Sequence, residues 1–244
     1  WETLEGLAKH NGPPALSGEQ HDRRLLHAVR DFEQQMDLQL DCFASGEAQA
    51  AALADDIAWH THDIDDGLRA GLLVRGDLRE VPLVRNIMRD LPEASDNEAS
   101  RDVHEIVRRL IAQLIADVVC QSRRRFSALA PQHPDEIRNA GVALVAFSED
   151  MQSSLGILRD FLFARLYHHP AVMKVMQGAE QVVQDLVRAY ADNECELPSA
   201  WQSDIAQLDG RKRMRRIADF VAGMTDRFAI AEHQRLFDVT PQLG

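Results

Sequence analysis

The chain has few cysteines and few aromatic residues for its length. Its three cysteines, Cys42, Cys120 and Cys195, are spread over 244 residues, and aromatic residues make up 6% of the chain. Cysteines so far apart form no CxxC pair and no Cys/His zinc spacing, which argues against a disulfide scaffold and a zinc-finger type of site. We therefore expect buried thiols that behave as small hydrophobic side chains in a reducing compartment, the cytoplasm.

Long hydrophobic runs and targeting signals are also missing. No apolar stretch approaches the roughly 20 residues needed to cross a bilayer, although 45% of the residues are hydrophobic. The first five residues, Trp1 to Glu5, have neither the basic region nor the apolar run of a signal peptide. The chain also opens without Met, inside a pattern typical of a helix. We expect a fragment of a cytoplasmic protein that does not bind membranes.

Positive charge is the third shortage. The chain has 27 Lys and Arg against 39 Asp and Glu, a net charge of -12, which argues weakly against a protein that coats nucleic acid. The run Arg211–Arg216 is an exception, because it opens a predicted helix, where positive charge opposes the helix dipole. Such runs are usually solvated. The alternative is an anion partner for Arg213, Arg215 and Arg216, either an effector dNTP or single-stranded DNA at an oligomer surface.

Helical periodicity, by contrast, is abundant. Apolar residues recur every three or four positions, as they do on the buried face of a helix. The clearest such segments are 103–119, 155–166, 172–190 and 213–231. A further helix is expected over 47–70, capped by Ser45, and only 142–147 has the composition of a strand. The predicted fold class is all-α, a bundle of roughly nine or ten helices.

The most unusual stretch is 53–68, where five acidic residues and two histidines fall within twelve positions. On a helix, Asp55, Trp59, Asp63 and Asp66 line one stripe. Like charges so placed repel each other unless a cation or a hydrogen-bond network compensates. An acidic face turned to water is the plain alternative. Because Trp59 lies within the stripe, we interpret the segment as a pocket that packs a ligand while carboxylates hold a cation.

Several blocks of this sequence resemble, in order, the bacterial dGTPase-like proteins, which are dNTP triphosphohydrolases of the HD superfamily. The blocks are 1–13, 47–49, 54–58, 61–72, 161–163, 167–170, 218–228 and 232–233. The resemblance implies a partial, multi-helix HD-superfamily bundle in which 1–130 is the remainder of the HD core and 131–244 a C-terminal helical region. It also implies a homo-oligomer, and it places the HD motif itself before Trp1.

The resemblance further implies metal-dependent hydrolysis of dGTP or another dNTP to deoxynucleoside and triphosphate. In the family a His, a later His-Asp pair and one further Asp bind a divalent metal, Mg²⁺, Mn²⁺ or a similar ion, and water attacks the α-phosphate. Only the last ligand maps onto this chain, at Asp55. No catalytic residue is assigned, and we expect the chain alone to be inactive. His10 and the pair His21-Asp22 imitate the ligand spacing, but the resemblance places them after the true motif.

Four further positions match substrate contacts of the family. Asp63 matches the residue that hydrogen-bonds the sugar 3′-hydroxyl. Trp59 stands where the family usually has Tyr, so a hydroxyl that helps to read the sugar is missing. Arg159 matches a basic position that meets the triphosphate, which a guanidinium grips as a fork, and Tyr167 matches the ring that packs against the nucleoside. Without the family, Arg159 would be a surface salt-bridge partner of Asp160 or Glu149, and Tyr167 a core residue.

Two functions therefore stay open. The first is a dNTP triphosphohydrolase whose HD segment is missing from this chain. The second is a non-catalytic helical module that binds a nucleotide or a partner protein without hydrolysis. Assays of the full-length protein with all four dNTPs and several metals would separate them.

Overall fold

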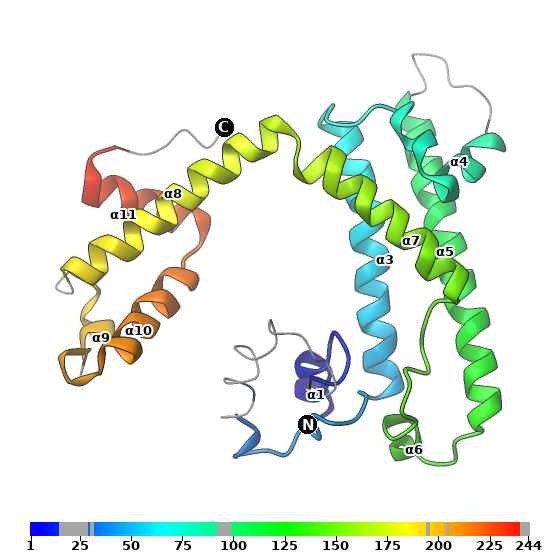
Figure 1. Cartoon of the computed structure of the whole chain (residues 1–244), viewed down its shortest axis with the longest axis horizontal. Helices are drawn as coiled ribbons and strands as arrows, with labels where there is room; N and C mark the ends of the chain where they lie inside the picture. Colours follow the sequence, from blue (N-terminus) through cyan, green and yellow to red (C-terminus); the bar gives the residue numbers. More distant parts are fainter. Residues whose placement is uncertain (15–28, 30–31, 92–98, 194–195, 204, 240–244) are drawn as a thin grey trace. The chain divides into compact units, whose positions relative to one another are not determined.

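The computed structural model describes residues 1–14, 29, 32–91, 99–193, 196–203 and 205–239, and within them every regular element is a helix (Figure 1). The all-α prediction is confirmed, and the described residues form ten α-helices, within the expected number. The chain divides into two compact units, Trp1–Leu166 and Tyr167–Gly244. The division into 1–130 and 131–244 rests on the family resemblance and stays a prediction. No helix of the described residues is long and apolar enough to cross a membrane.

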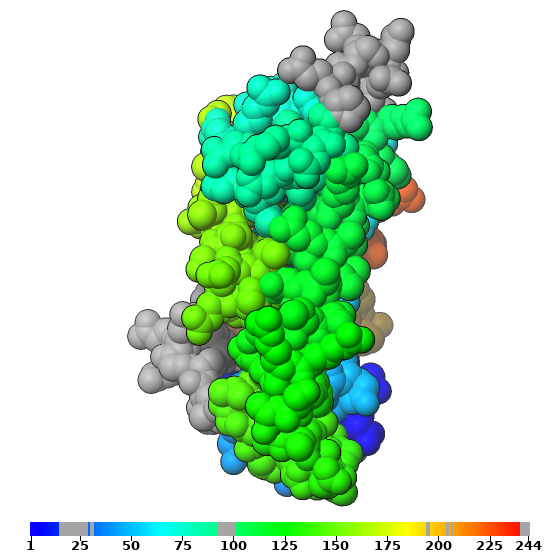
Figure 2. Space-filling view, turned by 90° about the vertical axis from the view of Figure 1, so that its right-hand side faces the viewer, coloured from blue at the N-terminus to red at the C-terminus, as the bar shows by residue number. Residues whose placement is uncertain are grey.

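The first unit is built around two long helices that pack on each other, α3 and α5. Its helices are α1 (Glu2–Ala8), α3 (Gly46–Arg69), the 3-10 turn η1 (Asp77–Glu80), α4 (Pro82–Arg89), α5 (Ala99–Leu129), α6 (Pro134–Arg138) and α7 (Glu149–Leu162). A π-helical turn, η3 (Phe163–Tyr167), follows α7. Figure 2 shows α5 along one face of this unit, with the α4 region at one end of it. Helices α1 and α7 both contact α3, so α3 is the central helix of this unit.

Local sequence explains where α3 begins and ends. Ser45 caps it, as predicted, by accepting a hydrogen bond from the backbone N–H of Ala48 at 3.2 Å. Gly71 follows its last turn with a φ of 69°, a left-handed conformation that glycine adopts without strain. Within the helix, a Cβ on Gly67 would lie 2.8 Å from Cδ1 of Leu73. A larger residue at this position would therefore require the side chains of Leu73 and Leu166 to shift.

The one segment predicted to have strand composition, 142–147, is a loop. Its backbone groups bond to side chains of neighbouring helices instead of to another strand. The N–H groups of Leu144 and Val145 donate to Gln49 Oε1 of α3, at 2.8 and 3.1 Å. The N–H of Ala146 donates to Ser122 Oγ of α5. The side chain of the buried Gln49 therefore accepts the hydrogen bonds that a neighbouring strand would otherwise accept from this apolar segment. The segment has no strand partner among the described residues.

The second unit contains α8 (Pro170–Asp192), α9 (Ser199–Gln202), the 3-10 turn η5 (Ile205–Gln207), α10 (Gly210–Ala222) and α11 (Asp226–Phe237). Its core is apolar. The buried residues are Val182, Leu186, Tyr190, Leu197, Ile205, Ile217, Phe220 and Val221. The single helix predicted over 213–231 is wrong, because the chain breaks after Ala222 and Thr225 caps a new helix by accepting from the N–H of Phe228.

Several expected core positions lie at the surface. In α5 the stripe is buried at Ile106, Leu110 and Leu114, whereas Ile115 and Val119 are exposed. In α8 the buried positions Val182, Leu186 and Tyr190 lie in the C-terminal half. The exposed positions of the predicted stripes in α8, α10 and α11 are Val175, Met176, Val183, Met214 and Phe228. The predicted stripes are therefore too wide.

The prediction of buried thiols is wrong for Cys120, which is exposed. Cys42 is half-buried, and Cys195 lies outside the described residues.

Candidate functional site

The predicted metal ligand, Asp55, lies on α3 with its side chain 71% exposed. His10, in the turn that follows α1, reaches it: His10 Nε2 lies 3.4 Å from Asp55 Oδ2. The family resemblance argues against this histidine as a ligand, and the fold nevertheless places it beside the carboxylate. His21 and Asp22 lie outside the described residues.

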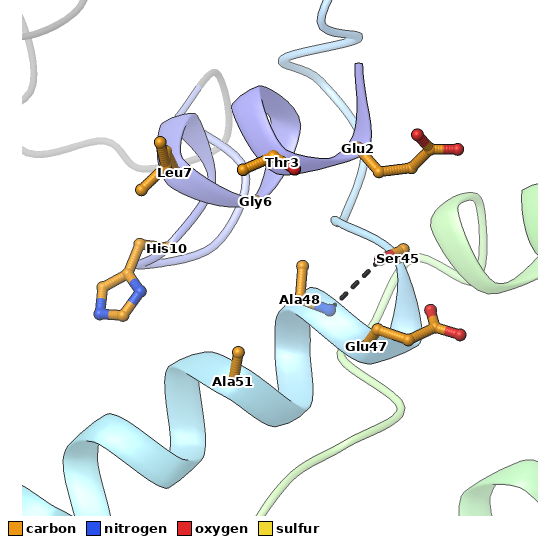
Figure 3. A pocket seen from close by; sticks show the side chains of 9 residues that line it. All are labelled: Glu2, Thr3, Gly6, Leu7, His10, Ser45, Glu47, Ala48 and Ala51. Carbon is orange, nitrogen blue, oxygen red and sulfur yellow. Dashed lines mark hydrogen bonds between the residues drawn. The ribbon is translucent and has the colours of Figure 1, made fainter.

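A pocket of about 360 Å³ lies next to this pair, between α1 and the first turns of α3 (Figure 3). Gly6 allows the two helices to approach, because a Cβ at this position would lie 3.1 Å from the Cβ of Ala48. His10 lines the pocket from the α1 side, and Ser45 and Ala51 line it from α3. The helices thus leave a hollow along the same helix as Asp55.

Helix α1 is held in place by a buried ion-pair network. The Glu5 carboxylate, with no exposed side-chain area, accepts from Lys9 Nζ at 3.0 Å and from Arg138 Nε of α6 at 3.0 Å. Lys9 Nζ also donates to the carbonyl of Phe43 at 3.4 Å. The ring of Trp1 lies 5.0 Å from the Arg138 guanidinium carbon. These contacts fix α1, and with it the turn that carries His10.

The most buried titratable group on this part of α3 is His60, which is 8% exposed. It stands one turn after Asp56 and one turn before Asp63, on the side of the acidic stripe that faces the core. Burial lowers the pKa of His60, the charges of Asp56 and Asp63 oppose that shift, and Arg159 of α7 reinforces it. Burial likewise raises the pKa of Asp56, which His60 and His10 partly offset. The fold thus assembles charges from two helices around one imidazole.

Three of the predicted substrate residues belong to the first unit. Trp59 and Asp63 lie on α3, one turn apart, and Arg159 lies in the last turn of α7. Trp59 is 42% exposed, and its ring lies edge-on to the ring of His60 with centroids 4.9 Å apart. Arg159 is exposed and makes no ion pair with another described residue, so the surface pairing with Asp160 or Glu149 is not formed. Their roles in binding substrate stay predictions.

Tyr167, the fourth predicted substrate residue, begins the second unit. It ends the π-helical turn η3 and is half-buried. The sequence pattern suggests that Tyr167 continues the helix that carries Arg159. In the structure the regular helix ends before Tyr167. Just beyond it, His169 caps α8 by accepting from the N–H of Ala171 at 3.3 Å, with Pro170 in the first turn.

The described residues do not make up a complete metal site. No group of three or more His, Cys, Asp or Glu side chains among them could hold an ion. The nearest approach is Asp55 with His10, which is one carboxylate and one imidazole. Divalent cations take more ligands than this from proteins, so these two side chains alone would not hold one.

The basic run at the start of α10 is engaged within its own unit. Asp209 caps the helix and pairs with Lys212, Arg215 pairs with Asp219 at 2.6 Å, and Arg216 donates to the carbonyl of Ser203. Asp209 and Asp219 thus offset part of the positive charge in the first turns of α10, for which the sequence alone offered no partner. An effector dNTP or single-stranded DNA at this run stays a prediction.

His60 and its neighbour Asp56 are the residues that sequence reasoning missed. Their spacing of four is visible on the predicted helix, but nothing in the sequence marks His60 as buried. Its burial depends on the tertiary packing of α3, which contacts α5 and α7. A histidine at the border between an acidic stripe and an apolar stripe is the available signal.

Comparison with known proteins agrees with the architecture. Residues 145–235 match the phosphohydrolase-associated domain. Over all of its length the chain is 46% identical to a deoxyguanosinetriphosphate triphosphohydrolase-like protein of Brucella anthropi and covers 61% of it. It is 44% identical to such a protein of Mesorhizobium japonicum and 45% identical to one of Nitrobacter hamburgensis, again with the whole chain aligned. The chain spans about three fifths of the length of these curated relatives. Along its whole length the chain is thus similar to proteins named deoxyguanosinetriphosphate triphosphohydrolase-like.

Proposed function

We propose that this chain serves in the hydrolysis of a deoxynucleoside triphosphate to deoxynucleoside and triphosphate. The observation that carries the proposal is the identity of 43–46% along the whole chain with relatives named for that reaction. In this reaction water adds to the α-phosphorus, the bond to the sugar 5′-oxygen breaks, and that oxygen takes up a proton.

The geometry of the first unit supports the proposal. One helix, α3, carries Asp55, Trp59 and Asp63 within nine residues, and α7 brings Arg159 close enough to act on His60. An aromatic ring can pack on a sugar or base, a carboxylate accepts from a sugar hydroxyl, and a guanidinium binds phosphate oxygens. These are the three parts of a dNTP, and each has a matching side chain here.

The proposal includes a divalent metal, Mg²⁺ or Mn²⁺, to which Asp55 would contribute one ligand. The remaining ligands are not among the described residues of this chain. Such a metal polarises a phosphoryl oxygen and lowers the pKa of bound water. The proposal further includes homo-oligomeric assembly, for which the resemblance to the family is the only support.

The test is hydrolysis by the full-length gene product. It is incubated with each of the four dNTPs and with Mg²⁺ or Mn²⁺, and deoxynucleoside is measured by chromatography. We expect Asp55→Ala to abolish hydrolysis and to weaken metal binding while leaving the helical circular dichroism spectrum unchanged. Asp160→Ala, which removes an exposed carboxylate of α7, is the matched control and should keep the wild-type rate. Equal rates for wild type and Asp55→Ala would refute the role of Asp55.

A second function has one observation in its favour. Because the described residues hold no three-ligand metal group, a helical module that binds a nucleotide without hydrolysing it fits this chain taken alone. Absence of hydrolysis of all four dNTPs by the full-length product, together with dNTP binding in calorimetry, would establish this alternative. Accordingly, we expect the 244-residue chain by itself to be inactive.

A further inference from the structure

His60 has a ring nitrogen with no partner in the described part of the chain. Its Nδ1 is buried and is hydrogen-bonded by no described residue. A buried polar atom without a partner destabilises the fold, so such atoms are rare in folded proteins unless a ligand or water satisfies them. The neighbouring buried polar residue on α3, Thr61, is fully satisfied by the carbonyls of Ile57 and Ala58, at 2.8 and 3.1 Å. On α3, only Asp65 Oδ1 shares this condition among the described residues, and the other oxygen of that carboxylate accepts from Arg69 at 2.7 Å.

The position of His60 relates it to the proposed substrate. It stands three residues before Asp63, and side chains at that spacing are neighbours on a helix surface. Its ring also lies edge-on to that of Trp59, at 4.9 Å between centroids. The charge of Arg159 on α7 also acts on it and lowers its pKa. The imidazole thus lies among three side chains to which the sugar and phosphate contacts are assigned.

The chemistry of a sugar hydroxyl requires more than a carboxylate. A hydroxyl donates one hydrogen bond and accepts others, whereas an ionised carboxylate only accepts. A hydroxyl that donates to Asp63 therefore still needs a donor for its oxygen. A neutral imidazole has one N–H donor and one acceptor nitrogen. Burial and the nearby Arg159 favour the neutral form of His60 by lowering its pKa.

We infer that His60 is a specificity-determining residue of the triphosphohydrolase site and that, together with Asp63, it binds the 3′-hydroxyl of the deoxyribose. This inference rests on the proposed function. If His60 has this role, a buried side chain helps to distinguish a 3′-hydroxyl from a 3′-hydrogen. The exposed acidic stripe of α3 would then not do so alone. His60 also supplies a polar group at the sugar where Trp59 has no hydroxyl.

The test compares dGTP with 2′,3′-dideoxy-GTP, which lacks only the 3′-hydroxyl, as substrates of the full-length gene product. His60→Phe removes both nitrogens and keeps a ring of similar size. We expect it to lower kcat/KM for dGTP about tenfold, the loss of one well-made hydrogen bond, mainly through a raised KM. The dideoxy substrate should be unchanged. Asp63→Asn in the same background should add less than it does alone, because both residues act on one hydroxyl.

The controls separate binding from folding. His104→Asn alters an exposed histidine of α5 and should leave the preference for dGTP intact. If His60→Phe does not fold, His60→Gln, which retains a donor, should keep part of the preference. An equal effect of His60→Phe on both substrates, or no effect on either, overturns the inference while leaving the hydrolase proposal standing. If wild type hydrolyses neither nucleotide, the hydrolase proposal fails, and binding is measured by calorimetry instead. The inference is supported if wild type binds dGTP more tightly than the dideoxy analogue and His60→Phe removes this difference. Any other result overturns it.

Discussion

The two units place their polar side chains differently. In the first unit the charges of Glu5, Lys9 and Arg138 are buried in the packing between α1 and α6. In the second unit the buried cluster is apolar apart from one tyrosine hydroxyl, and Tyr190 donates it to Glu232 at 2.7 Å, at the edge of the core. The first unit thus buries a network of three charged side chains. Among its described residues, the second unit buries one ionisable side chain outside the apolar cluster, His233, which lies 3.2 Å from Asp185.

This difference bears on function. A buried ion pair seldom adds net stability compared with apolar packing, but breaking one leaves an uncompensated charge and is costly. In the first unit that network fixes the turn that brings His10 to Asp55. The second unit has an apolar core, and the role of Tyr167 in binding stays a prediction. The other predicted site residues, Asp55, Trp59, Asp63 and Arg159, all lie in the first unit.

The largest expected effect in stability comes from breaking the network. Glu5→Gln leaves Arg138 and Lys9 buried with their main counter-charge removed, and it should lower the free energy of unfolding of the first unit by about 3–5 kcal/mol. Urea denaturation followed by the fluorescence of Trp59, in a variant with Phe at the other two tryptophans, measures it. Glu105→Gln, which removes a partly exposed carboxylate paired with Arg108 and Arg109, should have little effect. Equal effects of the two changes would show that the buried network contributes no more to stability than a pair near the surface.

A cavity in the second unit should rank next. Leu186 is fully buried in the apolar core, and Leu186→Ala should cost about 2–5 kcal/mol because the lost packing leaves a cavity. Trp201, whose ring lies 5.2 Å from that of Phe220 in this unit, reports the transition by its fluorescence. Val183→Ala, at an exposed position of the same helix, should change stability by less than about 0.5 kcal/mol. A first unit destabilised as much as the second would show that the two are not separately packed.

The smallest effect is a dependence on pH in the second unit. A hydrogen bond from His233 lowers the pKa of Asp185 below its ordinary value of 3.8. The carboxylate therefore contributes stability that is present above pH 3.8 and is lost as the pH falls through the lower, folded-state pKa. His233→Phe should flatten the fall in unfolding free energy between pH 4 and pH 2 in the Trp201 transition. An unchanged slope would show that this pair does not contribute to stability.

The sequence predicted those parts of the fold that local signals determine. The cap at Ser45, the first turn at Pro170 and the stripe of Leu155, Leu158 and Leu162 all follow from residues close together in the chain. The helix over 213–231 failed because its apolar periodicity continues in phase across the break, which the capping Thr225 marks. Capping threonines are a local signal, so this error was avoidable.

Long-range polar contacts could not be predicted in the same way. Glu5 and Arg138 are 133 positions apart. The residues next to each of them in the sequence resemble those around many surface charges. The acidic stripe of α3 was visible, and so was the position of Asp55 on it. The burial of His60 was not, because it depends on how α7 and α5 pack against that face. Sequence therefore located the helix of the site but not its buried member.

The identity of the phosphorus product decides whether the proposed reaction takes place. The full-length gene product is incubated with dGTP and Mn²⁺, and the reaction is followed by ³¹P nuclear magnetic resonance. We expect free triphosphate to appear in step with deoxyguanosine. Release of orthophosphate or pyrophosphate, or an unchanged spectrum with all four dNTPs tested, would contradict the assignment of this chain to triphosphate-releasing hydrolysis.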